Sequence, residues 1–280
     1  MVKRLSVLLS ALALAACASA APSGPVSLEQ VWRTEGFAQP ESVAPSADGK
    51  MFYVSNVAGE PAGKDGVGFI SRITPAGAVI DREWVTGLNA PKGMAVAGGK
   101  LHVSDIDALV TIDAATGAVA SRTPIEGARF LNDVAMARDG AVLISDSGGA
   151  KIYAVTNGAV SVWLADPLLA AVNGLTPERD RLLVSTMQGK VLAIDWTTRA
   201  ITVLGEGIGD GDGVSPLGGG HILVSEWRGR IFHMTPDGVP NTILDTREAR
   251  ILQNDFVLVG DTLYVANMLP GTVTAWKIKR

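Results

Sequence analysis

The sequence predicts an all-β fold, a six-bladed β-propeller with four antiparallel strands in each blade. The main observation is a pattern that recurs six times: an apolar strand that ends in Ser or Ala, followed by a polar residue. The Ser or Ala stands at positions 55, 104, 145, 185, 225 and 266, so that successive copies are 40–49 residues apart. The second observation is the abundance of glycine (32 residues) and proline (14 residues), which many tight turns require.

The same elements surround every copy of this pattern. A Gly-containing turn, as at 47–50 or 138–140, joins it to the innermost strand that precedes it. Another turn, as at 74–77, leads to a fourth strand, as at 160–163. Four short antiparallel strands in each repeat are typical of a propeller blade. The third strands lie at 70–73, 109–112, 152–155, 191–194, 231–234 and 273–276.

The two ends of the chain are predicted to close the ring together. The sequence stops at Arg280, directly after the third strand of the last repeat. Residues 31–34 precede the first repeat and have strand character, so we expect them to supply the missing fourth strand. This pairing would cover both sheet edges. A solenoid is the structural alternative, but it needs capped ends that the sequence does not show.

The first 20 residues have the pattern of an export signal. Lys3 and Arg4 provide the positive start, and the apolar stretch at 5–16 is too short for a stable membrane anchor. A Leu-Ala-Ala-Cys sequence ending at Cys17 matches a bacterial lipoprotein box, whereas an Ala-Ser-Ala site directly after it offers ordinary cleavage. We expect Cys17 to be lipidated, and the protein to be periplasmic or an outer-membrane lipoprotein.

Composition limits the remaining functions. Residues 21–27 are expected to form a tether, and residues 28–280 a single propeller domain that touches a membrane only through the lipid anchor. Hydrophobic residues make up 47% of the chain and charged residues 19%, which argues against disorder. A net charge of −4 without a Lys or Arg run argues against a nucleic-acid partner. Because Cys17 is the sole cysteine, the folded body has no cysteine for disulfides or metal ligands. We expect a monomer that acts on a small molecule.

A polar residue opens the innermost strand of every predicted blade, two positions before an apolar residue. Because these strands line the central channel and begin at one mouth of it, the six side chains are expected to converge. Their carboxylate and amide oxygens are hard ligands, so we predict one divalent cation, calcium, with magnesium, manganese or zinc as alternatives. These entrance residues are Glu41, Lys92, Asn132, Asn173, Asp212 and Asn254.

Two alternative interpretations weigh against this site. Polar residues at strand starts can simply solvate the channel or form turns, and Asn173 before Gly174 is typical turn chemistry. The six-fold register of the set favours a site over that interpretation. A histidine-based site is disfavoured, because His102, His221 and His233 all lie away from the entrance positions.

The entrance residues also carry a family resemblance. Over about residues 28–280 the chain resembles the senescence-marker-protein/gluconolactonase (regucalcin-like) family, whose wider relatives include paraoxonases. That family places Glu in the first blade, Asn in the third and fourth, and Asp in the fifth around one divalent cation. The resemblance implies metal-dependent hydrolysis of a lactone or related ester. The matching residues here, and the metal ligands that we expect, are Glu41, Asn132, Asn173 and Asp212.

Asp212 is the first candidate for the general base, a role to which the resemblance also points, and Asp133 is the second. Neighbours on a regular strand face opposite sides, which disfavours Asp133 beside the ligand Asn132. A non-catalytic exported propeller that binds a ligand or a partner protein is the alternative function.

Three further residues are predicted to bind substrate. Lys92 could hold a substrate carboxylate or oxyanion, or it could reach away along its own stem. Asn254 shares the mouth of the channel. The family has an Arg two residues before the third-blade Asn, whereas Arg129 lies three residues before Asn132.

Overall fold

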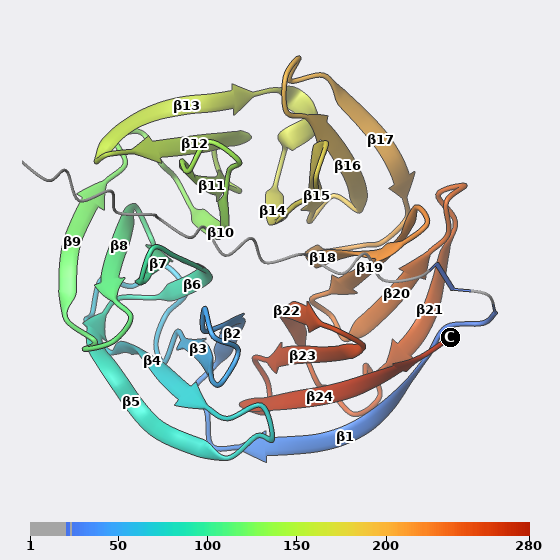
Figure 1. Cartoon of the computed structure of the whole chain (residues 1–280), viewed down its shortest axis with the longest axis horizontal. Coiled ribbons are helices and arrows are strands. Elements are labelled where there is room, and N and C mark those ends of the chain that lie inside the picture. The colour runs from blue at the N-terminus through green and yellow to red at the C-terminus, as the bar shows by residue number, and fades with distance from the viewer. Residues whose placement is uncertain (1–20, 23) are drawn as a thin grey trace, which may run out of the picture.

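The predicted propeller is confirmed in a computed structural model, which describes residues 21, 22 and 24–280. These residues form six antiparallel sheets of four strands each, arranged in a ring around a common axis (Figure 1). The predicted export signal and Cys17 lie outside the described residues. The described part of the chain has one short helix, η1 (Pro167–Leu169), and none with the length and hydropathy of a membrane span.

From the inside outward, each blade contains four strands in sequence order, and the last blade borrows its outermost strand from the start of the chain. The first three blades are β2 (Pro40–Pro45), β3 (Phe52–Asn56), β4 (Gly68–Ile73) and β5 (Val79–Leu88); β6 (Pro91–Ala97), β7 (Lys100–Asp105), β8 (Ala108–Asp113) and β9 (Val119–Pro124); β10 (Leu131–Met136), β11 (Val142–Asp146), β12 (Lys151–Thr156) and β13 (Ala159–Ala165). The last three are β14 (Val172–Pro177), β15 (Arg181–Thr186), β16 (Lys190–Asp195) and β17 (Ile201–Glu206); β18 (Gly211–Gly218), β19 (His221–Glu226), β20 (Arg230–Met234) and β21 (Pro240–Asp245); β22 (Gln253–Val259), β23 (Thr262–Asn267), β24 (Thr272–Lys279) and β1 (Ser27–Glu35).

The expected closure of the ring is confirmed as well. β1 pairs antiparallel with β24, with Ser27 opposite Lys279 and Glu35 opposite Thr272. The contribution of the N-terminal segment begins one residue earlier, because Val26 is already buried among apolar residues of the last two blades. No blade therefore presents an unpaired third strand to solvent.

The core lies between neighbouring blades. Leu143 and Ile152 of the third blade, for example, pack against Leu175, Leu182 and Leu192 of the fourth, and all five are essentially buried. Each sheet is therefore covered on both faces. Because successive side chains of a middle strand are then all buried, the sequences of these strands are nearly continuous apolar runs. The outermost strands are the most exposed, as β9 illustrates.

A β-bulge occurs at the same place in all six innermost strands. In β2, for example, Pro40 pairs with Asn56 and Val43 with Val54, so Glu41 and the residue after it face a single residue of β3. The corresponding shifts occur in β6, β10, β14, β18 and β22. A bulge re-aims side chains and ends simple alternation. The sequence argument that neighbours at these positions face opposite sides assumed a regular strand, which the structure does not have here.

Candidate functional site

The six entrance residues all lie at the bulges, on strands that surround the propeller axis (Figure 1). Their side chains are buried, with 2–5% of their surface exposed. Polar groups at this depth need partners, because an unpaired buried polar group costs free energy. The bulges thus place six polar side chains, two of them acidic and one basic, at one end of the propeller axis.

The recurring serine of the repeat holds these bulges in shape. The Ser185 hydroxyl accepts the Gly174 N–H at 2.9 Å and donates to the carbonyl oxygen of Asp212 in the next blade. Between the second and third blades, the Ser104 hydroxyl likewise donates to the carbonyl oxygen of Asn132. At these two junctions, the serine of the repeat therefore also positions the entrance residue of the next blade.

Two further carboxylates follow entrance residues directly, three blades apart. Asp133 accepts the N–H groups of Val134 at 2.7 Å and Leu175 at 2.6 Å. Asp255 accepts the Phe256 N–H at 2.7 Å and the Ser42 hydroxyl at 2.6 Å. Sequence reasoning missed Asp255. A signal was present, because the dipeptide Asn-Asp occurs at both 132–133 and 254–255.

Glycines make room for these two carboxylates. A Cβ atom on Gly213 would lie 2.7 Å from Oδ1 of Asp255, and one on Gly93 would overlap Asp133. Both glycines occupy the second bulge position of the preceding blade. Each carboxylate therefore sits against a blade that offers it no side chain.

Four carboxyl groups now share the mouth of the channel: those of Glu41, Asp133 and Asp212 are buried, and that of Asp255 is partly buried. Burial raises the pKa of Glu41 well above its usual value, and the charges of Asp212 and Asp255 raise it further. Burial and then Asp255 also raise the pKa of Asp212. The pKa of Asp133 rises for the same two reasons, although two backbone N–H bonds oppose the change. The carboxylates at this site therefore repel one another, and the nearby positive charge does not fully compensate for them.

The residues present fit a divalent cation. Oε2 of Glu41 and Oδ1 of Asn254 are fully buried and have no hydrogen-bond partner among the described residues. The amide of Asn132 donates to the Ser147 hydroxyl at 3.3 Å, which leaves its oxygen as the atom suited to a cation. A hard cation would satisfy such oxygens and offset the carboxylate repulsion. Within the described residues, no group of three His, Cys, Asp or Glu side chains is arranged for a metal, so amides would have to complete the ligand set.

Lys92 does reach away along its stem. Its Nζ donates to the carbonyl oxygens of Pro61 at 2.9 Å and Ala90 at 3.1 Å, and it lies 4.6 Å from the centre of the Phe130 ring. Burial lowers the pKa of Lys92, while Glu41 opposes that change. The ammonium group therefore ties the loop at 57–67 to the mouth of the channel and still feels the charge of the site.

Arg129 lies at the edge of this arrangement. Its backbone N–H donates to the buried Asp146 carboxylate at 3.2 Å, which fixes the start of β10, and its residue surface is exposed. Arg129 does not join the buried set.

The comparisons with known proteins identify the fold. No family model and no curated protein matches the sequence. Among solved structures, the chain is similar to a protein provisionally assigned as a gluconolactonase, with a TM-score of 0.66 and 18% identity over 92% of this chain and 93% of that one. It is also similar to a streptogramin B lyase (TM-score 0.64, 14% identity, 91% and 98% covered). A catalytically inactive variant of virginiamycin B lyase from Staphylococcus aureus, solved with quinupristin, gives a TM-score of 0.62 at 14% identity, with 90% and 99% covered. At these identities, the chain shares with these proteins the fold alone, a six-bladed propeller.

Proposed function

We propose that the protein is a metal-dependent hydrolase that opens a lactone or a related ester. One divalent cation, with calcium as the first candidate, would be held by Glu41, Asn132, Asn173 and Asp212. The observation that carries the proposal is the buried entrance ring, in which like-charged carboxylates lie together and Glu41 keeps an unpartnered oxygen. A bound cation would offset the repulsion among these carboxylates.

The chemistry of the site suits acyl transfer to water. When bound, the cation would polarise the substrate carbonyl and stabilise the oxyanion that forms there. Asp212 would accept a proton from water as the water oxygen attacks the carbonyl carbon. The carbon–oxygen bond of the ester would then break, and Asp212 would return the proton to the departing alkoxide oxygen. Asp133 is the weaker candidate for this base, because both of its oxygens already accept backbone N–H bonds.

Substrate contacts would come from the rest of the mouth. Asn254 offers a buried amide beside the expected metal ligands. Lys92 would have to release the Pro61 carbonyl before it could bind a substrate anion. Arg129 would act from the exposed edge.

Calorimetric titration of the metal-free protein with calcium tests the proposal first. We expect saturable binding that is lost in Glu41→Gln and in Asp212→Asn. The control is Glu248→Gln, which removes an exposed carboxylate and should bind as the parent does. A lactone and ester screen follows, in which Asp212→Asn should be inactive. Unchanged turnover in that variant would eliminate the proposed base.

Two alternatives have distinct outcomes in the same experiments. Two of the similar structures are lyases, which break a bond without water, so elimination would yield an unsaturated product instead of an acid and an alcohol. If the parent protein binds no divalent cation, the metal-dependent mechanism is wrong, and a non-catalytic propeller that binds a ligand or partner becomes the better explanation.

A further inference from the structure

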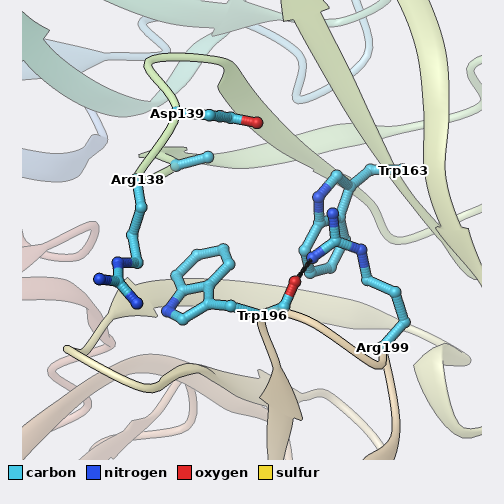
Figure 2. Close-up of a pocket in the computed structure, with 6 residues that line it drawn as sticks. Arg138, Asp139, Trp163, Trp196 and Arg199 are labelled. Carbon is cyan, nitrogen blue, oxygen red and sulfur yellow. Dashed lines mark hydrogen bonds between the residues drawn. The ribbon is translucent and has the colours of Figure 1, made fainter.

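A cavity of about 360 Å³ opens between the third and fourth blades, on the face opposite the entrance ring (Figure 2). β10 begins at the ring and ends at Met136, directly before residues 137–139, which contribute three of the lining residues, so the two places lie at opposite ends of one strand. The cavity shares no residue with the entrance ring. Its lining consists of Ala137, Arg138, Asp139, Trp163, Trp196 and Arg199.

The turn that supplies Trp196 and Arg199 to this lining has an internal counterpart. In the turn between β16 and β17, Oδ1 of Asp195 accepts two backbone N–H bonds and the hydroxyl of Thr198 at 2.9 Å. In the turn between β8 and β9, Oδ1 of Asp113 accepts the same three bonds, with the hydroxyl of Thr116 at 3.0 Å. The two turns therefore have the same conformation, and their residues can be matched one by one.

Two large residues replace small ones in the fourth blade. Counted from the aspartates, Trp196 takes the position of Ala114, and Arg199 that of Gly117. Gly117 has a φ of +80°, a region in which glycine is favoured, and Arg199 adopts a φ of +62° there. Like seven other non-glycine residues of the described chain, Arg199 adopts a left-handed backbone conformation, and here its side chain forms part of a cavity wall.

The two added side chains build the cavity wall together. The Arg199 guanidinium lies 4.0 Å from the centre of the Trp163 ring and donates to the carbonyl oxygen of Trp196. The two indoles meet edge to face, with their centres 5.9 Å apart. Figure 2 shows the Trp196 indole extending toward Arg138 across the cavity. A flat apolar surface thus stands beside a guanidinium group.

The polar groups define the ligand. Arg138 is exposed, and its side chain makes no hydrogen bond or ion pair within residues 24–280. Asp139 uses Oδ1 for the Ala141 N–H at 3.1 Å, which leaves Oδ2 to accept a hydroxyl. Two guanidinium groups and one carboxylate leave the lining one positive charge in excess, which favours an anionic ligand.

We propose that this cavity binds the uronate residue of an acidic saccharide. The carbon–hydrogen face of a pyranose ring would pack on the Trp196 indole, because dispersion favours close apolar contact. Arg138 would pair with the sugar carboxylate in the bidentate manner of guanidinium groups, and Asp139 would accept a ring hydroxyl. The volume lies within the range of small-molecule sites.

Tryptophan fluorescence titration with glucuronate and galacturonate tests the proposal. We expect saturable binding of at least one uronate, at least tenfold weaker binding of glucose, which lacks the carboxylate, and none of acetate, which lacks the ring. Equal affinity for glucose, or no response to either uronate, would overturn it. Arg138→Ala should weaken uronate binding about tenfold, as read by calorimetry.

The internal counterpart supplies matched variants. Trp196→Ala and Arg199→Gly restore the residues of the second blade, and each should lose uronate binding. Arg199→Gly also places a glycine where the backbone is left-handed, a conformation that glycine adopts without steric cost. The thermal midpoint of this variant should therefore not fall. A lower thermal midpoint with unchanged uronate binding would show that Arg199 has only a structural role, and would refute the proposal. The exposed Arg179→Ala is the control, and Asp212→Asn should keep uronate binding, which separates this site from the entrance ring.

Discussion

The stability of the metal-free protein should depend on pH through Asp255. Burial raises the pKa of Asp255 from 3.8 to about 6, although bonds from the Ser42 hydroxyl and the Phe256 N–H oppose the change. Between these values the folded state keeps a proton that the unfolded chain has released, so the free energy of unfolding falls as the pH rises from about 4 to 7. At about 1.4 kcal/mol for each pKa unit, the ionised carboxylate costs about 3 kcal/mol at neutral pH.

Asp255→Asn should remove the part of this dependence that Asp255 contributes, and leave the part that comes from Glu41, Asp133 and Asp212, whose pKa values burial also raises. The amide can keep both contacts, because its oxygen can accept the Phe256 N–H and its NH2 group can donate to Ser42. At pH 7 the variant should gain up to about 3 kcal/mol, or about 6–12 °C in thermal midpoint, whereas near pH 4 it should match the parent. Thermal denaturation in a chelator, followed by circular dichroism from pH 4 to 8, measures the difference.

The control for this series is Asp180→Asn, which changes an exposed carboxylate in a turn. It should leave the pH dependence of the parent unchanged. Parallel curves for the parent and Asp255→Asn would refute the reasoning, since they would mean that Asp255 ionises in the folded protein as it does in the unfolded chain. Calcium at 100 times its dissociation constant should add about 2.7 kcal/mol at pH 7, and much less at pH 4.5.

Three other substitutions test the architecture of the mouth. Ser185→Ala leaves a buried N–H and the Asp212 carbonyl without their shared partner, and should cost about 2–3 kcal/mol in denaturant unfolding. Gly174→Ala places a Cβ that overlaps the Asp212 carbonyl oxygen and lies 2.8 Å from the Ser185 hydroxyl, and should cost about 1–3 kcal/mol and weaken calcium binding in calorimetry. Lys92→Met removes a cation that acts on Glu41, and should tighten calcium binding about tenfold, or 1.4 kcal/mol.

Each of these variants has a matched control. Ser161→Ala changes an exposed serine on the outermost strand of the third blade, and Gly24→Ala adds a Cβ where no atom lies within 4 Å. Neither should alter stability by more than about 0.5 kcal/mol. Lys151→Met, on the third strand of its blade, is the control for Lys92→Met and should leave calcium affinity unchanged. Weaker calcium binding in Lys92→Met would show that its bond to the Pro61 carbonyl matters more than its charge.

The fold could be predicted because every blade carries the same local sequence features. Apolar runs, Gly-containing turns and a terminal Ser or Ala recur with the blade, so six copies reinforce one interpretation. The entrance residues could be found because they keep this register. Asp255 was missed because its importance depends on Ser42, 213 residues away in the sequence, and on a bulge that only strand pairing reveals. The partner of Lys92 was equally hidden, because Pro61 lies in a long loop without a readable pattern.

The junction between the last and first blades shows how fold and site depend on each other. The last blade carries Ala266 where its neighbours carry a serine, so no marker hydroxyl is available there to position the first blade. The Ser42 hydroxyl crosses that junction instead, in the opposite direction, to reach Asp255. Because this carboxylate acts electrostatically on Glu41 and Asp212, the contact that closes the ring also sets the charge of the mouth. A cation bound there would therefore stabilise the junction where the two ends of the propeller meet.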